Sequence, residues 1–245
     1  MSARARLALF AAGAVGLAAL LAWGFSGLAD FGHYPGPYGD VLNRVAVRQR
    51  HVTSVVAATV FDYRGFDTLG EEFILFASAA GVALLLREAR ERDAVLRDPV
   101  ADRTVRAVGL LLVGPAVLLG LYVVAFGYLS PGGGFQGGVL LAAGLVLVWA
   151  AGSYRAYSRV SPTTVVDLAE GLAAAAFPAL GLALLASGGA FLENVLPLGT
   201  RGSLLSGGTI PLLNWTAAIT VTAAVTLIVA EFLEELAVPL RRPTR

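Results

Sequence analysis

The sequence contains no cysteine, no lysine and only two histidines, and each shortage excludes a class of site. Without cysteine the chain forms no disulfide, no thiolate metal site and no cysteine-ligated iron–sulfur cluster. Because all 18 basic residues are arginine, the chain has neither a P-loop lysine nor a lysine that forms a Schiff base. With His33 and His51 as its only histidines, the chain has few side chains from which to form a His-based metal centre or catalytic triad. We therefore expect no metal, no cofactor, no catalytic residue and no enzymatic activity.

Apolar residues are what the chain has in excess. Hydrophobic residues make up 57% of the sequence and charged residues 14%, against about 25% charged residues in typical soluble domains. The mean hydropathy is +0.74. The net charge of +1 gives no reason to expect a nucleic-acid partner. This composition predicts a polytopic protein embedded in a lipid bilayer.

The stretch "YLSPGGGFQGGVLL" matches a dinucleotide-binding pattern, G-x-G-x-x-G, at Gly132, Gly134 and Gly137. That pattern binds a nucleotide only between a strand and a helix of a βαβ unit. Here it lies between two uncharged apolar runs, and the first is long enough to cross a hydrocarbon core of about 30 Å. We therefore expect a tight turn that opens into a closely packed helix, with Gly134 and Gly138 as a small-residue pair. The alternative is irregular backbone that lines a water-filled cavity.

Six apolar segments are long enough to span a membrane, and they predict an all-α integral membrane protein. The first is too long for a signal peptide and lacks a clean cleavage site before Asp30, so we expect it to be retained. Residues 41–61 are interrupted by arginine, and their clean apolar part is too short to span, which predicts one short interfacial or half-buried helix. The expected spans are residues 7–29, 68–86, 107–129, 135–154, 164–187 and 209–231.

The distribution of arginine predicts the orientation. With both termini and the charged loop 87–106 in the cytoplasm, 13 of the 18 arginines lie inside, as the positive-inside rule favours. This arrangement places residues 41–61 at the outer surface, and a seventh span is the alternative. The charged loop also divides the chain into residues 1–90 and 100–245.

The stretch "TVFDYRGFDTLGEE" crowds charged residues against the start of a span. One interpretation is structural: Thr68 and Glu71 form a capping box, and Asp62 pairs with Arg64. The other places Asp67 and Glu71, four residues apart on one helix face, on a proton or cation path at the membrane edge.

Other acidic residues, together with one asparagine, stand near the ends of the last two spans and in the loop between them. We expect them to be solvated among the lipid headgroups, with a conducting role as the alternative. No span carries a charge at its middle, and a complete ion carrier usually has one there, so we expect the chain not to be a transporter by itself. These residues are Asp167, Glu170, Glu193, Asn194, Glu231, Glu234 and Glu235.

Two groups of motifs resemble components of one family. Residues 55–86 resemble the D-[FY]-R-G-[FL]-D-T-[LM]-G-E segment that ends the large A subunit of Mrp-type Na+/H+ antiporters. That segment also forms the small E subunit of the related membrane-bound hydrogenases. "LSPGGGFQGGVLLAAGLVL", "FLEN" and "SGGTIPLLNWTAAITV" resemble the antiporter B subunit, the MnhB domain. The chain thus resembles an A-subunit tail (residues 1–90) fused to a B subunit (residues 100–245).

The resemblance implies a multisubunit complex of the prokaryotic inner membrane that exchanges Na+ for H+. The pumping machinery of that complex belongs mainly to the large A and D subunits, so this chain would be a non-pumping subunit that contributes helix packing and part of the ion path. The alternatives are a subunit of a hydrogenase-like or other redox-driven complex, and a scaffold without an ion role. The resemblance favours Asp67 and Glu71, beside Asp62 and Arg64, for conduction. It favours the turn residues for assembly: Pro131, Gly132, Gly133, Gly134, Phe135, Gly137 and Gly138.

Overall fold

The structure is a computed structural model that describes residues 3–28, 32–33, 36–89, 94–95, 102–186, 188–235 and 238–239. Within these residues six helices are long and apolar enough to cross a membrane, which confirms the predicted all-helical fold with six spans. They are α1 (Ala3–Ser26), α4 (Gly65–Ala89), α5 (Arg103–Ala125), α6 (Gly134–Ala151), α8 (Thr163–Ala186) and α9 (Ile210–Glu235).

Short elements connect these helices. The predicted connection after the fourth span forms a short helix, α7 (Tyr154–Val160), whose first turn is capped by the Ser153 hydroxyl. Two-residue strands β1 (Ala94–Val95) and β2 (Val238–Pro239) pair in antiparallel orientation. α5 begins four residues before the predicted span because the Asp102 carboxylate accepts hydrogen bonds from the first amides of the helix. These amides hold the pKa of Asp102 below its usual range.

Residues 41–61, for which one short interfacial or half-buried helix is predicted, form separate helical pieces because the chain breaks at His51. Helix α2 (Pro37–Arg50) ends there, and His51 adopts a positive φ of 53°. The chain resumes in α3 (Val55–Ala58) and a π-helical turn, η1 (Thr59–Tyr63). The amides of Thr53 and Ser54 donate to the carbonyl of Tyr128 at 3.2 and 3.1 Å. This docking replaces the helical hydrogen bonds that the break removes.

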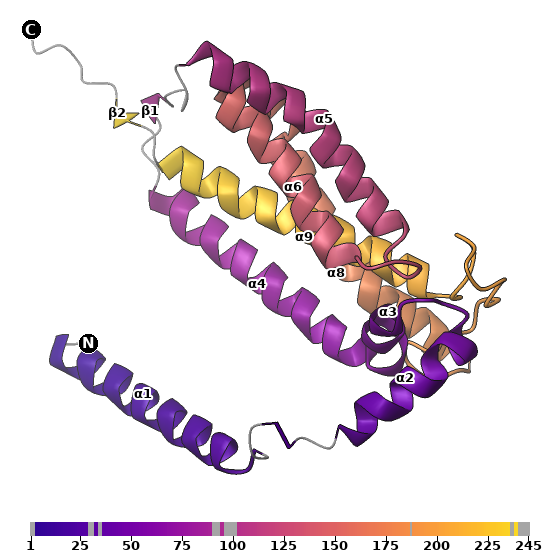
Figure 1. Cartoon of the computed structure of the whole chain (residues 1–245). Coiled ribbons are helices and arrows are strands. Elements are labelled where there is room, and N and C mark those ends of the chain that lie inside the picture. The colour runs from indigo at the N-terminus through magenta and orange to yellow at the C-terminus, as the bar shows by residue number, and fades with distance from the viewer. Residues whose placement is uncertain are drawn as a thin grey trace, which may run out of the picture. The chain divides into compact units, whose positions relative to one another are not determined.

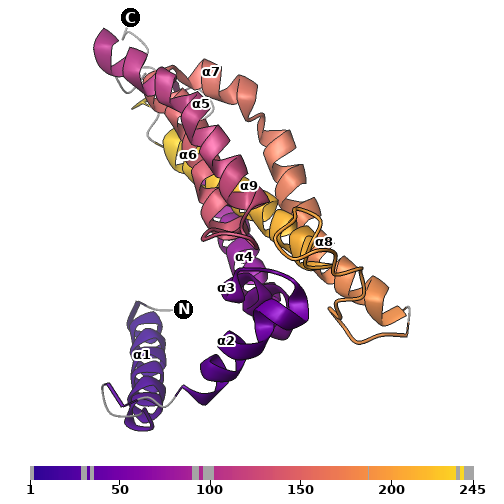
Figure 2. The same ribbon diagram turned by 45° about the vertical axis from the view of Figure 1, so that its right-hand side comes forward.

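The chain divides into two compact units, residues 1–41 and 42–245. In the first unit, the apolar stretch of α1 buries none of its residues against other protein. In the second, α9 is the central helix, with 56% of its apolar stretch buried. It contacts α4, α6 and α8, and Figures 1 and 2 show these helices packed around it.

Two apolar clusters fix how α4, α8 and α9 run within the second unit. Cluster 1 joins the start of α4, the later half of α8 and the start of α9 through Leu69, Phe177 and Leu213. Cluster 2 joins the later half of α4, the start of α8 and the middle of α9 through Ala83, Val166 and Ala224. Helix α4 is therefore parallel to α9, whereas α8 is antiparallel to both (Figure 1).

Candidate functional site

Asp62 ties η1 to the loop that precedes α9. The Arg50 Nε donates to one carboxylate oxygen of Asp62 at 2.7 Å, and the Asn194 amide donates to the other at 2.7 Å. The predicted pairing of Asp62 with Arg64 is therefore wrong. Arg64 forms an ion pair with Asp67 instead, and both side chains are about half exposed. Such an exposed pair contributes little to stability.

The predicted capping box at Thr68 and Glu71 is also wrong, since α4 begins before Thr68. The Thr68 side chain is buried, and its hydroxyl donates to the carbonyl of Val60 at 2.5 Å. The π-helical turn explains the shift: the Arg64 amide bonds back to the Thr59 carbonyl, five residues earlier, and the chain passes almost directly into α4.

Glu71 lines a recess of about 200 Å³ that also borders the glycine-rich turn. Two motifs that are 60 residues apart in the sequence thus meet at one place. Glu71 supplies the titratable side chain of the recess, whereas Asp67 is held by Arg64. The other lining residues are Val56, Ala57, Val60, Phe61, Gly132, Gly133, Gly134, Phe135 and Gln136.

The glycine-rich turn requires glycine for two separate reasons. Gly132 and Gly133 have φ angles of 153° and 145°, which side chains with a Cβ rarely adopt. Gly134 and Gly138 lie against α9, where an added Cβ would be 2.2 Å from the Asn214 carbonyl oxygen and 2.8 Å from that of Ala218, respectively. α6 and α9 are therefore in backbone contact, and this contact needs residues without a side chain.

Asn214 joins this turn to α5 and α9. Its side chain is fully buried. The side-chain oxygen, Oδ1, accepts a hydrogen bond from the Gly134 amide at 2.7 Å, and the side-chain NH2 group donates to the backbone carbonyl of Val124 at 2.8 Å. The sequence patterns predicted no role for Asn214. The available signal was an amide in an apolar run, where a polar group needs partners from its own protein.

Glu72, rather than Glu71, is the carboxyl that α4 buries. Its side chain is fully buried, and neither carboxylate oxygen has a hydrogen-bond partner among the described residues. Thr220 on α9 and Glu71 are its polar neighbours. Glu72 lies on the same face of α4 as Ala79 and Ala83, which pack in cluster 2.

Glu170 is the second enclosed carboxyl. It is 4% exposed, and its Oε1 has no hydrogen-bond partner among the described residues. It follows Val166 by four residues, so both lie on the face of α8 that packs on α4 and α9. The expectation that such carboxylates are solvated is therefore wrong for Glu170. Glu72 and Glu170 each lie about 10 Å into their helices, inside the membrane-spanning segments Gly65–Arg87 and Thr163–Ala186.

An ion cluster closes the far end of the α4–α8–α9 interface. The Arg87 guanidinium donates to both Asp167 oxygens at 2.9 and 3.1 Å, and its Nε donates to Glu231 at 2.6 Å. Glu231 is only 2% exposed, so Arg87 compensates a buried charge there rather than a solvated one. We call Arg87, Asp167 and Glu231 the Arg87 cluster. It joins α4 to the part of the chain that follows residue 100.

Two tyrosines extend the polar contacts beyond the Arg87 cluster. The Tyr154 hydroxyl donates to Glu234, and the Tyr157 hydroxyl donates to the Thr226 carbonyl at 3.1 Å. Burial raises the pKa of Tyr157, which keeps its hydroxyl a donor. The side chain of Glu235 lies outside the described part of the structure. Glu193, in the loop before α9, accepts the Ala190 amide at 2.7 Å.

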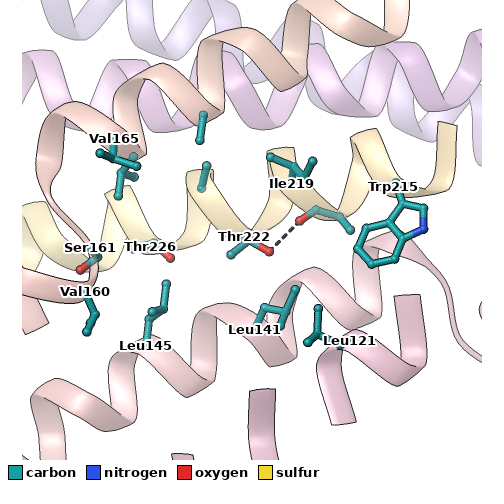
Figure 3. A pocket seen from close by; sticks show the side chains of 14 residues that line it. Leu121, Leu141, Leu145, Val160, Ser161, Val165, Trp215, Ile219, Thr222 and Thr226 are labelled. Atoms are coloured by element: carbon teal, nitrogen blue, oxygen red, sulfur yellow. Dashed lines mark hydrogen bonds between the residues drawn. The ribbon is translucent and has the colours of Figure 1, made fainter. Parts of the chain in front are cut away.

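A larger pocket, of about 350 Å³, is lined by apolar side chains of α5, α6, α8 and α9 (Figure 3). Among its polar groups, the Thr222 hydroxyl donates to the carbonyl of Ala218, as the dashed line shows. Its lining includes no acidic, basic or histidine side chain. This pocket is therefore a poor place for ion chemistry, and the buried carboxyls of the α4–α8–α9 interface are the better candidate.

The described part of the chain brings no three His, Asp or Glu side chains together in a way that could hold a metal ion.

Six apolar helices with carboxyls enclosed at one interface define a multi-pass helical membrane protein. The chain belongs to the family described as "Domain related to MnhB subunit of Na+/H+ antiporter", whose profile matches residues 104–227, about half of the sequence. The resemblance to the MnhB domain is thereby confirmed over residues 104–227. The assignment of residues 1–90 to an A-subunit tail stays a prediction.

Two curated proteins are similar in sequence. An uncharacterized protein of Methanocaldococcus jannaschii is 27% identical over 208 residues, which are 74% of this chain and 78% of that protein. A probable A/B subunit of a K(+)/H(+) antiporter of Rhizobium meliloti (strain 1021) is 35% identical over 133 residues. That match covers 45% of this chain and only 13% of the relative.

Two solved structures are similar in fold. One is a chain of the membrane-bound sulfane sulfur reductase, an archaeal respiratory membrane complex. It has a TM-score of 0.71 and 29% identity, over 95% of this chain and 99% of that chain. The other is a chain of the Mrp complex from Dietzia sp. DQ12-45-1b, with a TM-score of 0.64 and 24% identity. The match covers 94% of this chain but 26% of that chain, and it shows the fold alone.

Proposed function

We propose that this chain is a non-pumping membrane subunit of a multisubunit cation/proton antiporter of the Mrp type, with Na+ and H+ as the exchanged ions. The observation that carries the proposal is the match to 99% of one chain of a multisubunit membrane complex, together with membership of the MnhB-related family. The similarity to part of a probable K(+)/H(+) antiporter subunit supports an antiporter.

In this role the chain has no chemistry of its own and acts through packing and through part of the ion path. The glycine-rich turn supports the packing role, since its close contact with α9 fixes how the helices meet. The recess at Glu71 supports the ion-path role. Large apolar side chains such as Ile74, Leu111 and Leu118 lie exposed on the spans and would face lipid or other subunits in the cell membrane.

A redox-driven ion-translocating complex is the second candidate. One observation favours it: the solved chain that this protein matches over nearly its whole length comes from a respiratory complex. Both candidates place the chain in the same kind of membrane module, and they differ in what the neighbouring subunits do.

Purification from native membranes through a tag on this chain separates the two candidates. Identification of the co-purified subunits by mass spectrometry should yield the large antiporter subunits and no hydrogenase or sulfur-reductase subunits. Redox subunits in the preparation would instead establish the second candidate. Deletion of the gene should abolish Na+-dependent proton exchange in everted vesicles, and unchanged exchange would refute both.

The role of Glu71 is tested by Glu71→Gln in the assembled complex. Gln keeps a hydrogen-bonding group of the same size but does not titrate, so exchange should collapse while the amount of complex on native gels is unchanged. Normal exchange in this variant would leave Glu71 a structural residue. The purified chain alone in liposomes should show no Na+-dependent proton flux.

A further inference from the structure

Two buried carboxyls, Glu72 and Glu170, have no task in the function proposed above. Both are enclosed by protein inside membrane-spanning helices, and each has at least one oxygen without a hydrogen-bond partner among the described residues. An ionised carboxylate enclosed in this way is costly unless a partner compensates it. Ionisable groups kept inside a membrane despite this cost usually belong to an ion or proton route.

The two carboxyls lie in one layer of the bundle. Glu72 on α4, Glu170 on α8 and Thr220 on α9 each fall between the parts of their helices that form cluster 1 and cluster 2. At a rise of about 1.5 Å per residue, the two carboxyls differ in height by roughly one helical turn. The layer is therefore a polar interruption of an otherwise apolar interface of three helices.

Titratable groups adjoin this layer at both ends. Glu72 is next to Glu71 in the sequence, and Glu71 borders the recess at the glycine-rich turn. Glu170 follows Asp167 of the Arg87 cluster by three residues, so the two carboxyls lie on the same side of α8. Titratable groups therefore lie at both ends of the interface, and Glu72 and Glu170 lie between these ends.

We propose that Glu72 and Glu170, with the Thr220 hydroxyl, form a proton path through the α4–α8–α9 interface from the Glu71 recess to the Arg87 cluster. The proposal rests on the function proposed above and names the residues of its ion path. A proton is favoured over a metal cation, because the described residues hold no group of three or more acidic or histidine ligands. Each transfer breaks one O–H bond and forms another, and a proton that enters at one end leaves at the other.

Isosteric variants in the assembled complex test the path. Glu72→Gln and Glu170→Gln keep size and hydrogen-bonding capacity but do not carry a proton. In everted vesicles each should reduce Na+-dependent proton exchange to below about a tenth, since proton transfer at a positioned group typically contributes a factor of that size or more. Glu193→Gln is the matched control, because Glu193 lies exposed in a loop, and it should exchange normally. Full exchange in both buried variants would overturn the path.

The gene deletion keeps this test separate from that of the function. If deletion abolishes exchange but both Gln variants retain it, the proton path is wrong and the subunit role stands. If deletion leaves exchange intact, the subunit role is wrong and the path falls with it.

A second measurement covers variants that fail to assemble. Dicyclohexylcarbodiimide modifies protonated carboxyls in apolar surroundings, and peptide mass spectrometry of the wild-type complex locates the product. Labelling at Glu72 and Glu170 should decrease as the pH rises, because a carboxyl on a path exchanges its proton with the solution. Labelling that is absent or independent of pH at both residues would overturn the proposal.

Discussion

Replacement of Gly134 by alanine tests the close contact between α6 and α9. The new methyl group would be 2.2 Å from the Asn214 carbonyl oxygen and 3.0 Å from the Ala218 amide nitrogen. Since carbon and oxygen atoms normally approach to about 3.3 Å, the two helices must separate by roughly 1 Å. Such overpacking costs about 1–3 kcal/mol.

The same separation weakens a buried hydrogen bond. The Gly134 amide donates to the Asn214 side chain at 2.7 Å, and both groups are buried. A buried polar group left without its partner costs about 1–3 kcal/mol. We therefore expect Gly134→Ala to lower the free energy of unfolding by about 3 kcal/mol.

The measurement is the unfolding of the purified full chain in mixed micelles, titrated with a denaturing detergent. Gly114→Ala on α5 is the matched control, since an added Cβ there meets no atom within 4 Å. Because alanine is the better helix former by up to about 1 kcal/mol, the control should be as stable as the wild type or slightly more stable. If Gly134→Ala unfolds at the same concentration of denaturing detergent as the control variant, the inferred backbone contact between α6 and α9 is refuted.

Three further predictions concern other parts of the chain. Arg87→Gln should lower the free energy of unfolding by about 2 kcal/mol in the same titration. This is less than the roughly 3–5 kcal/mol expected for a fully buried ion pair, because the Arg87 side chain is 36% exposed. The double variant Arg87→Gln, Glu231→Gln should recover part of the loss, because it also removes the buried charge of Glu231. The pKa of Asp102 is lowered on folding, so its capping of α5 should be complete above the unfolded value of about 3.9 and lost as the pH falls through the folded value. Hydrogen exchange of the Thr104 and Val105 amides measures this loss, and protection that is unchanged at low pH would contradict it. An Ala94→Cys variant of this cysteine-free chain should resist an impermeant thiol reagent added to intact cells, whereas labelling from outside would reverse the predicted orientation.

The sequence was sufficient to predict the six spans because the length of an apolar run directly reflects the thickness of the bilayer. It was insufficient at Glu71 and Glu72, which are neighbours in the sequence but point about 100° apart on a helix. Packing decides which of them is buried. Glu72 precedes Ala79 by seven residues, two helical turns, so the face that brings Ala79 to α9 also encloses Glu72. This seven-residue spacing can be read from the sequence, but an interpretation based only on the number of charged residues near the helix start does not use it.

The capping box at Thr68 and the break of residues 41–61 into separate helices escaped prediction for a different reason. Both predictions assumed that local patterns decide helix ends, whereas contacts distant in the sequence decide them here. The Tyr128 carbonyl receives the amides of the broken segment, and Asn194 and Arg50 hold Asp62 in the π-helical turn. Tyr128 and Asn194 lie far outside residues 41–72, so that stretch alone does not indicate these two partners.

The contacts at both ends of α4 have a consequence for how the genes of this module can be arranged. Asp62 and Asn194 hold the segment before α4 to the loop preceding α9, and Arg87 holds the end of α4 to α8 and α9. None of these contacts depends on the peptide link through residues 90–101. Two separate polypeptides cut in that link would retain the same mutual interface, so fusion or division of the gene leaves the interface unchanged. What the continuous chain adds is a fixed one-to-one stoichiometry of the two segments, without a separate assembly step.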